Sequence, residues 1–452
     1  MAHEGRGRVR LRTAAATPSE QMSALPRASE VVVIGGGIAG AATAYYLAKA
    51  GVPVTLCEKG RIAGEQSSRN WGWIRKQGRD PRELPAIILA LRLWEEIAGA
   101  LDEDIGWHRG GVAYLAESAA ELARYEAWLP HARAYQLDTR LLSPTETDAL
   151  LGQDGRRFAG ALFTASDARA EPARAVPALA RAAAQSGAAI HEGCAVRTLE
   201  MQAGRVAGVV TERGPIACRA VVLAGGAWSA LFLRHLGVEL PQLTVKASVQ
   251  RTGPVPLITQ SAVGATRAAF RRRQDGGYTI ARSGAVTFDL TPAAVRHFRA
   301  FLPALREKWG EIKLRLGRAF VDELTTSVSW APDRPTPFER TRVLDSSPDH
   351  AVLDQVMRDA ANLFPQLRGV RPVERWAGMI DVTPDEIPVL GPVDGIPGLL
   401  VATGFSGHGF GLGPAAGYLM AQLATGQAPS VDLHPFRFAR FQQRDVTRYP
   451  EL

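Results

Sequence analysis

Cysteine is scarce in this sequence: three of the 452 residues are cysteines, Cys57, Cys194 and Cys218. They are far apart and form no C-x-x-C pair, so we expect neither a disulfide framework nor a zinc site. An apolar segment that could act as a secretory signal is also missing before residue 31. We therefore expect a protein of a reducing compartment, the cytoplasm, with no metal in its site.

A large excess of charge of one sign is missing as well. The formal net charge is +8, and residues 1–28 supply +3 of it through their arginines. Basic residues are not interleaved with aromatic ones in a single patch, so we expect no nucleic-acid partner. The surplus suits an anionic substrate, although an arginine-rich composition explains it equally well. Residues 1–28 are expected to form a disordered tail.

No stretch is suited to span a membrane. Residues 31–48 carry no charge, but they are rich in glycine and alanine and include the polar Thr43. Such a segment is a poor transmembrane helix, and we expect none.

The same stretch instead carries the strongest signal in the sequence. Residues 31–34 are apolar and β-branched, which predicts a strand buried on both faces. Gly35, Gly37 and Gly40 follow with the G-x-G-x-x-G spacing and open a helix, and Glu58 ends the next predicted strand. Such glycines let a pyrophosphate approach the helix N-terminus, and the carboxylate accepts hydrogen bonds from a ribose. The pattern predicts a dinucleotide site.

The rest of the chain alternates helical and strand patterns. We expect helices at 85–101, 117–137, 172–186, 291–310 and 348–363, a hairpin at 105–116, strands at 188–199 and 205–212, and an antiparallel sheet over 243–290.

Three uncharged, glycine-rich strand ends lie near residues 31–44, 221–229 and 399–420. Parallel strands end at one edge of a sheet, so we expect these segments to meet in one nucleotide-binding domain. The fold class is α/β (α+β overall), with a Rossmann-like domain of the glutathione-reductase type built from separated segments and an inserted mixed antiparallel-sheet substrate domain. The expected boundaries are 29–80, 165–235 and 365–430 for the first domain, 81–164 and 236–364 for the second, and 431–452 for a C-terminal extension.

The last glycine-rich segment favours a flavin over a nicotinamide. Residues 404–413 contain five glycines and one histidine, and Pro414 follows at an early helical position. A second helix N-terminus would place positive potential beside a reduced isoalloxazine, which carries negative charge. The alternative is that residues 404–413 form a glycine-rich turn with a structural role only.

Several motifs together resemble one family. They are VVVIGGGIAGAATAYYLAKAG from residue 31, EQSSRNWGW at 65–73, DARAEP at 167–172, VVLAGGAWS at 221–229, RWAGMIDVTPDEIPVLGPV at 375–393 and GFSGHGFGLGPAAG at 404–417. The chain resembles the D-amino-acid oxidase-like family of FAD-dependent oxidoreductases over nearly all of residues 30–426. The resemblance implies that FAD is held by Gly35, Gly37, Ile38, Ala39, Gly40, Glu58, Lys59, Ser67, Ser68, Asn70, Trp71, Val196, Gly225, Gly226, Trp228, Gly404, Gly407, His408, Gly409 and Gly411.

The resemblance also implies the chemistry, which is oxidation of a C–N bond next to a carboxylate. The flavin takes the hydride, and the imine product hydrolyses in water. The protein must orient the substrate, usually by binding its carboxylate through an arginine. Arg75 is the first candidate for this role. Further catalytic candidates are Arg271, Tyr278 and His408, with Lys76, Arg272, Arg273 and Arg282 as other cations and Trp71 and Trp73 as walls. The alternative for each of these residues is a purely structural role, as a solvated arginine or an aromatic residue of the core.

The sequence departs from the monomeric sarcosine oxidase pattern at three places. Gly411 stands where those enzymes have a substrate-binding lysine, and residues 378–382 contain no cysteine to link FAD covalently. The loop at 67–73 has no histidine for such a link either, so we expect non-covalent FAD. The lysine that activates oxygen is not identifiable.

Three alternatives to an amino-acid oxidase therefore remain open. A dehydrogenase would pass electrons to a partner protein or a quinone. A flavin monooxygenase typically carries a G-D segment before the last glycine-rich helix, which GFSGHG lacks. The third alternative is a non-catalytic protein that FAD stabilises.

Overall fold

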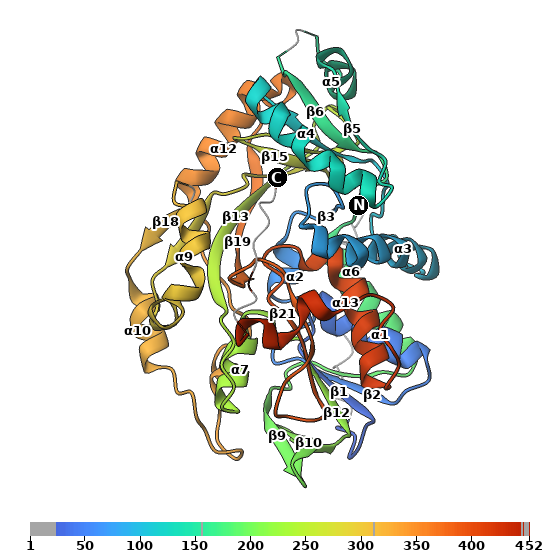
Figure 1. Cartoon of the computed structure of the whole chain (residues 1–452), viewed down its shortest axis with the longest axis vertical. Coiled ribbons are helices and arrows are strands. Elements are labelled where there is room, and N and C mark those ends of the chain that lie inside the picture. The colour runs from blue at the N-terminus through green and yellow to red at the C-terminus, as the bar shows by residue number, and fades with distance from the viewer. Residues whose placement is uncertain (1–23, 155–156, 311, 444–445, 447–451) are drawn as a thin grey trace, which may run out of the picture.

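The structure is a computed structural model, and it describes residues 24–154, 157–310, 312–443, 446 and 452. Most of the tail expected at residues 1–28 lies outside the described residues. The described chain is built on two large sheets that stand side by side (Figure 1).

The first sheet confirms the Rossmann-like expectation. Its order is β20 (Val389–Pro392), β21 (Leu399–Thr403), β12 (Ala220–Leu223), β1 (Val31–Ile34), β2 (Val54–Cys57) and β8 (Ala189–His191). All neighbouring pairs are parallel except β20 with β21. The three glycine-rich segments follow β1, β12 and β21, which are neighbours, so they meet at one edge of the sheet.

The apolar run of β1 is buried on both faces. Val31 and Val33 pack in the cluster that contains α1 (Ile38–Lys49), α3 (Leu84–Ala100), α6 (Pro172–Gln185) and α13 (Gly409–Ala424). Val32 packs in the cluster on the other face. That cluster is formed with α7 (Ser229–His235) and the small antiparallel sheet of β9 (Val196–Gln202), β10 (Arg205–Thr211) and β11 (Gly214–Ala217).

The second sheet has ten strands and is mixed. Its members are β18 (Ile312–Arg315), β17 (Val286–Asp289), β13 (Leu243–Thr252), β16 (Tyr278–Ala281), β15 (Ala269–Arg272), β14 (Ala262–Gly264), β4 (Val112–Ala116), β6 (Gly160–Thr164) and β5 (Thr139–Leu142), with β19 (Pro372–Val382) paired to β13. Helix α12 (His350–Leu363) packs on one face. Helices α4 (Ala119–Ala134) and α5 (Pro144–Leu151) lie near the β5–β6 end (Figure 1). The short pair β3 (Trp73–Ile74) and β7 (Ala168–Arg169) completes the described sheets.

The structure corrects three of the local expectations. Residues 105–116 form no hairpin, because β4 pairs with the distant β6 and β14. The strand expected at 188–199 is divided between β8 and β9, which belong to different sheets. The helix expected at 291–310 is two helices, α8 (Pro292–Arg296) and α9 (Phe298–Glu307). Within residues 243–290 the strands pair antiparallel as expected, and the two parallel pairings, β14 with β4 and β17 with β18, are made with strands outside that region.

The long strand β19 has no counterpart among the sequence-based expectations. It pairs along its length with β13, so residues 372–382 belong to the ten-stranded sheet. The domain division given above stays a proposal, and these residues sit in the sheet that it assigns to the substrate domain.

Helices α1 and α13 pack together more closely than side chains on both would allow. A Cβ at Gly413 would lie 2.2 Å from Cγ1 of Ile38, and one at Gly417 would lie 2.4 Å from Cβ of Ala42 and 2.5 Å from backbone atoms. Glycine at these two positions therefore sets the separation of the helices.

We predict that Gly417→Ala destabilises the protein by about 1–3 kcal/mol, because the added methyl overlaps backbone that cannot rotate away. Gly99→Ala in α3 is the matched control. No atom lies within 4 Å of a Cβ at Gly99, so this change should be neutral or stabilising by up to about 1 kcal/mol. Chemical denaturation measures both. Equal stability of the two variants would contradict the close packing.

Candidate functional site

A cavity of about 1690 Å³ separates the two sheets. Its floor comes from residues that follow β1, β2, β12 and β21. Its opposite wall includes alternate residues of β13, namely Leu243, Val245, Ala247 and Val249, together with residues 378–382 of β19. Because strand residues alternate between faces, these four side chains lie on the same face of β13, and this face lines the cavity.

The first glycine loop forms one end of this cavity. Gly35 has φ +108°, and a Cβ there would lie 2.4 Å from the carbonyl oxygen of Ala224. Helix α1 begins after Gly37 without a side-chain cap. The N–H of Ile38 donates to Oγ of Ser67 over 2.9 Å. The N-terminus of α1 therefore opens onto the cavity as a site for a phosphate group.

Glu58 lies where the ribose carboxylate was expected. Its two carboxylate oxygens accept from the N–H groups of Gly36 and Gly60, each over 2.6 Å. Burial raises the pKa of Glu58, and these backbone donors oppose that rise. The carboxylate is therefore held at the loop by the backbone and faces the cavity.

Lys59, Glu65 and Trp228 form a contact group at the same end. Nζ of Lys59 lies 2.7 Å from Glu65 and 4.4 Å from the centre of the Trp228 ring. The indole N–H of Trp228 donates to Glu65 over 3.1 Å. Val196, Gly225 and Gly226 line the cavity beside this group.

A second helix N-terminus opens onto the cavity at its other end. Helix α13 begins after His408 without a side-chain cap, and Gly407, His408 and Gly409 all line the cavity. Nδ1 of His408 lies 3.3 Å from the fully buried Glu83 carboxylate, which is 3.5 Å from Nη1 of Arg79. The buried Asp381 carboxylate accepts from the N–H of Gly404 over 2.7 Å and holds the turn.

Most of the residues expected to contact FAD line this one cavity. They are Gly35, Gly37, Ile38, Ala39, Glu58, Lys59, Ser67, Asn70, Trp71, Val196, Gly225, Gly226, Trp228, Gly407, His408 and Gly409.

Gly40, Ser68, Gly404 and Gly411 are not among the residues that line the cavity in the described structure, and contact of these four with FAD stays a prediction. Two of these glycines provide close packing. A Cβ at Gly40 would lie 1.9 Å from the carbonyl oxygen of Gly35, and one at Gly404 would lie 2.5 Å from Cγ2 of Thr383. The carbonyl oxygen of Gly411 accepts from the indole N–H of Trp94 over 3.1 Å.

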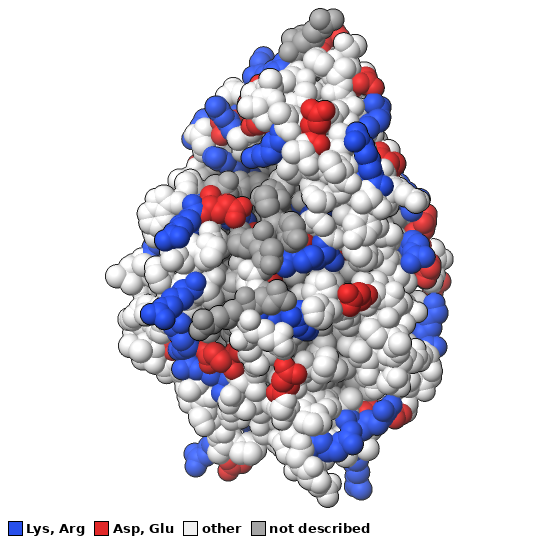
Figure 2. Space-filling view, viewed as in Figure 1, with Lys and Arg blue, Asp and Glu red and all other residues white. Residues whose placement is uncertain are grey.

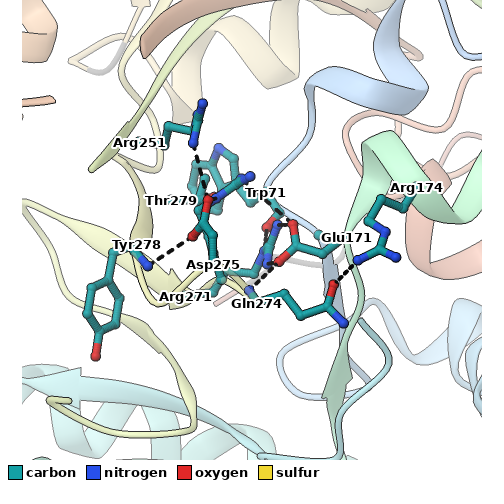
Figure 3. A network of polar contacts seen from close by, with 12 residues as sticks. Trp71, Glu171, Arg174, Arg251, Arg271, Gln274, Asp275, Tyr278 and Thr279 are labelled. Carbon is teal, nitrogen blue, oxygen red and sulfur yellow. Dashed lines mark hydrogen bonds and ion pairs between the residues drawn. The ribbon is translucent and has the colours of Figure 1, made fainter. Parts of the chain in front are cut away.

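Arg271 and Tyr278 also lie off the cavity, so neither is placed to contact a substrate. Arg271 is 1% exposed, and its guanidinium makes two bonds to Glu171, of 2.8 and 2.9 Å. Its Nε also donates to the carbonyl of Trp71 (Figure 3). Tyr278 is buried against α12, and its hydroxyl accepts from the N–H of Ile258 over 2.8 Å. The alternation of side chains along the predicted strand indicates which face Arg271 occupies, but it does not indicate that Glu171 binds it.

Arg75 and Arg282 do line the cavity. Nη1 of Arg75 donates to the carbonyl of Gln77, and its guanidinium lies 5.7 Å from the centre of the Tyr114 ring. Arg282 directly follows β16, is exposed, and makes no ion pair with any described residue. Trp71 and Trp73 also line the cavity and stand edge to face, with ring centres 5.4 Å apart.

Sequence reasoning missed part of the lining. Gln66 accepts from the N–H of Asp381 and thereby links the flavin loop to β19. The Arg79–Glu83–His408 group was not expected either, since nothing in the spacing of these residues connects η1 (Pro81–Glu83) to α13. Residues of α8, α9 and β18 close another side of the cavity.

The described helices include none that is long and apolar enough to cross a membrane. A cluster of three or more metal-binding side chains is likewise not found among the described residues.

Two helix N-termini, the carboxylate of Glu58 at the end of β2 and a long cavity define a flavoprotein of the Rossmann type. They fit FAD, because the ADP end and the flavin end each have a helix N-terminus and the cavity exceeds the size of ordinary ligand sites.

Comparison with known proteins agrees with this class. The sequence profile described as FAD dependent oxidoreductase (DAO) matches residues 30–423. Glycine oxidase of Pseudomonas aeruginosa is 29% identical over 90% of this chain and 97% of its own length. Sarcosine oxidase subunit beta of Rhodobacter capsulatus is 25% identical over 92% of this chain and 91% of its own length. The structure of L-amino acid deaminase from Proteus myxofaciens superposes with a TM-score of 0.89 at 33% identity, covering 93% of this chain and 95% of that one.

The chain belongs to the DAO family of FAD-dependent oxidoreductases. It is an oxidoreductase with FAD as its cofactor, which confirms the resemblance seen in the sequence.

The Arg271–Glu171 pair yields a prediction about pH. Burial raises the pKa of Glu171, but the hydrogen bonds and charge of Arg271 outweigh it and bring the pKa to about 2, below the ordinary 4.5. The pair therefore stabilises the fold fully above pH 4.5, and this stabilisation is lost as the pH falls from 4.5 towards 2. We expect Glu171→Gln to cost about 2–3 kcal/mol near pH 7 and progressively less below pH 4.5.

Denaturation curves across this pH range measure the difference between the variant and the unchanged protein. Glu103→Gln removes the exposed pair with Arg181 and is the control, and it should change stability little at any pH. A cost for Glu171→Gln that does not vary with pH would contradict the assignment.

Proposed function

We propose that this enzyme oxidises the C–N bond of an amino acid or an N-substituted amino acid to an imine, which water then hydrolyses. The observation that carries the proposal is the cavity itself, which Arg75, Arg282 and apolar side chains line together with the second helix N-terminus. The relatives named above act, by their names, on glycine, sarcosine and L-amino acids. Bound FAD supplies the oxidant, because N5 of its flavin ring accepts a hydride from the carbon that carries the amine.

The chain's own residues orient the substrate. Arg282 is the better placed carboxylate ligand, because its guanidinium is exposed at the cavity and forms no ion pair with a described residue. Arg75 is the second candidate, with part of its donor capacity used by Gln77. A guanidinium that makes two bonds to the carboxylate fixes the rotation of the substrate about its Cα. Trp71 and Trp73 would then limit its movement from the side.

FAD is proposed to be bound without a covalent link. Residues 378–382, which line the cavity, contain no cysteine, and the lining cysteine Cys57 ends β2 at the ADP end. Acid precipitation of the purified yellow protein should leave the flavin in the supernatant. Flavin that stays in the pellet would contradict the non-covalent assignment.

The test of the reaction is anaerobic reduction of the flavin by a panel of substrates. The panel contains D-amino acids, L-amino acids, N-methyl amino acids and cyclic imino acids. We expect at least one class to bleach the absorbance of oxidised flavin with saturation kinetics. A yellow protein that no member of the panel bleaches would refute amino-acid oxidation while leaving the family assignment untouched.

The electron acceptor gives a second form of the proposal, in which a partner protein or a quinone replaces oxygen. The similarity to a subunit of sarcosine oxidase favours a partner. Mixing the reduced enzyme with air in a stopped-flow instrument distinguishes the two forms. Fast reoxidation supports an oxidase, and slow reoxidation supports a dehydrogenase. A cytoplasmic location is inferred from cysteine use alone.

We predict that Arg282→Met weakens substrate binding about tenfold to a hundredfold, since a charge-assisted hydrogen bond is lost. Arg75→Met should have the smaller effect. Arg205→Met, at the exposed first residue of β10, is the control and should bind substrate as the unchanged protein does. The substrate concentration at half-maximal flavin reduction is the measurement. Unchanged binding in both cavity variants would exclude these arginines.

A further inference from the structure

A row of aromatic rings leads along the cavity from the loop at 65–73 to helix α4. It consists of Trp71, Trp73, Tyr114 and Tyr125, which all line the cavity. Neighbouring ring centres in this row are 5.4 Å, 6.3 Å and 6.2 Å apart. A Cβ at Gly264 of β14 would lie 3.0 Å from Cδ1 of Tyr114 and 3.5 Å from Cη2 of Trp73. The glycine therefore makes room for the row against the ten-stranded sheet.

The two ends of the row belong to different parts of the protein. Trp71 comes from the loop in which Ser67 accepts from the N–H of Ile38, at the N-terminus of α1. Tyr125 comes from α4, is 5% exposed, and donates its hydroxyl to the carbonyl of Leu115 over 3.3 Å. The row therefore connects the cofactor end of the cavity with α4, and its last ring presents a face rather than a free hydroxyl.

Arg124 lies at the far end of this row. It lines the cavity and is exposed, and its guanidinium carbon lies 5.8 Å from the centre of the Tyr125 ring. It makes no ion pair with a described residue. Glu121, one turn earlier on α4, also lines the cavity, but its carboxylate accepts from the hydroxyl of Thr266 over 2.7 Å and from the N–H of Glu117 over 2.6 Å. The charge of Arg124 is therefore available to a ligand.

Arg124 and Arg282 reach the cavity from separate elements. Arg282 directly follows β16, whereas α4 is attached through Glu121 to Thr266, which follows β14. Strands β14 and β16 flank β15, so they are about 10 Å apart. Two cations that start from such separate backbone positions suit two anionic groups of one ligand better than a single carboxylate.

Side chains of positive charge are also accessible at this end of the molecule. Figure 2 shows lysine and arginine side chains in the upper part of the face, where Figure 1 places α4. An anionic ligand that enters from this side meets cations before it reaches the cofactor end of the cavity.

We propose that the substrate carries a second anionic group, on its side chain or on a substituent of its nitrogen, and that Arg124 binds this group. The inference rests on the proposed oxidation of an amino acid and specifies which class of amino acid is used. The carbon that carries the amine must lie at the flavin, where Arg282 or Arg75 binds the neighbouring carboxylate. The carbon chain between the two anionic groups then packs along the aromatic row, and its free end accepts two hydrogen bonds from the guanidinium of Arg124. Arg124 determines specificity and takes no part in the reaction at the C–N bond.

The test compares pairs of compounds that differ in the distal charge. Glutamate and glutamine, each as D and L forms, test a side chain, and N-carboxyethylglycine and N-propylglycine test a nitrogen substituent. Each compound reduces the FAD-loaded full chain anaerobically, and the concentration for half-maximal flavin reduction is measured. We expect the anionic member of at least one pair to need a concentration at least about tenfold lower, because it gains a charge-assisted hydrogen bond.

Variants show which residue causes the difference. Arg124→Gln should bring the ratio between the two members of the pair close to one, and Arg124→Lys should retain part of it. Arg282→Met should weaken both members alike and so preserve the ratio. Arg133→Gln is the matched control, because Arg133 is exposed on the same helix and does not line the cavity in the described structure. Flavin content and unfolding temperature confirm that each variant is folded.

Binding without reaction gives a second measurement. Glutarate and butyrate lack the amine and cannot reduce the flavin, but binding beside it shifts its absorbance. Glutarate should bind at least about tenfold more tightly than butyrate, and Arg124→Gln should remove this difference.

The possible failures are distinguishable. If neutral compounds reduce the flavin as well as their anionic counterparts, the second anionic group is refuted and amino-acid oxidation stands. A preference for the anionic member that survives Arg124→Gln would refute the role of Arg124. A preference for lysine over norleucine and glutamate would assign the far end of the row to a cation beside Glu121 instead. If neither these compounds nor the wider panel reduce the flavin, amino-acid oxidation falls and this inference falls with it.

Discussion

The close approach of α1 to α13 is the contact on which the cavity depends. Both helices start at the same edge of the parallel sheet, and each start is free of a side-chain cap. Gly413 and Gly417 allow the helices to lie side by side, so their positive ends open onto one cavity rather than onto two. FAD has an adenosine at one end, a pyrophosphate in the middle and a flavin ring at the other end, so it can use both helix N-termini. The two glycines therefore set the separation of the two helices whose N-termini line the cavity.

The sequence predicted this half of the site well, because it depends on backbone geometry. Glycine spacing, an apolar β-branched strand and the carboxylate of Glu58 are local patterns. Each of them depends on the backbone conformation at its own position, so it can be recognised without knowing the rest of the fold. The six-stranded sheet was predictable for a related reason, since three similar glycine-rich strand ends can meet at one edge. Gly40 and Gly404 were correctly singled out as special, but they provide close packing rather than contact with the cavity.

The substrate half was predicted less well, because it depends on which distant side chains pair. Alternation in β15 places Arg271 on a face, but only the fold reveals that Glu171 and the carbonyl of Trp71 use its donors (Figure 3). Tyr278 lies on the opposite side, against α12, which no local pattern reports. The hairpin expected at 105–116 failed for the same reason, since β4 finds its partners about 50 and 150 residues away. Neither the charge of a residue nor the alternation of a strand identifies which residue or strand it pairs with when the two are far apart in the sequence.

The bond from Arg271 to Trp71 has a consequence for how this enzyme can be altered. Arg271 lies in the sheet that shapes the substrate side, whereas Trp71 lies in the loop beside the cofactor. The two halves are therefore not independent modules that could be exchanged between relatives. A graft that replaces β15 without Glu171 and the Trp71 loop would leave a buried arginine without its carboxylate, and the loop would lose a donor that holds its backbone. New specificity is more readily introduced in α9 and β18, which line the cavity without entering the core.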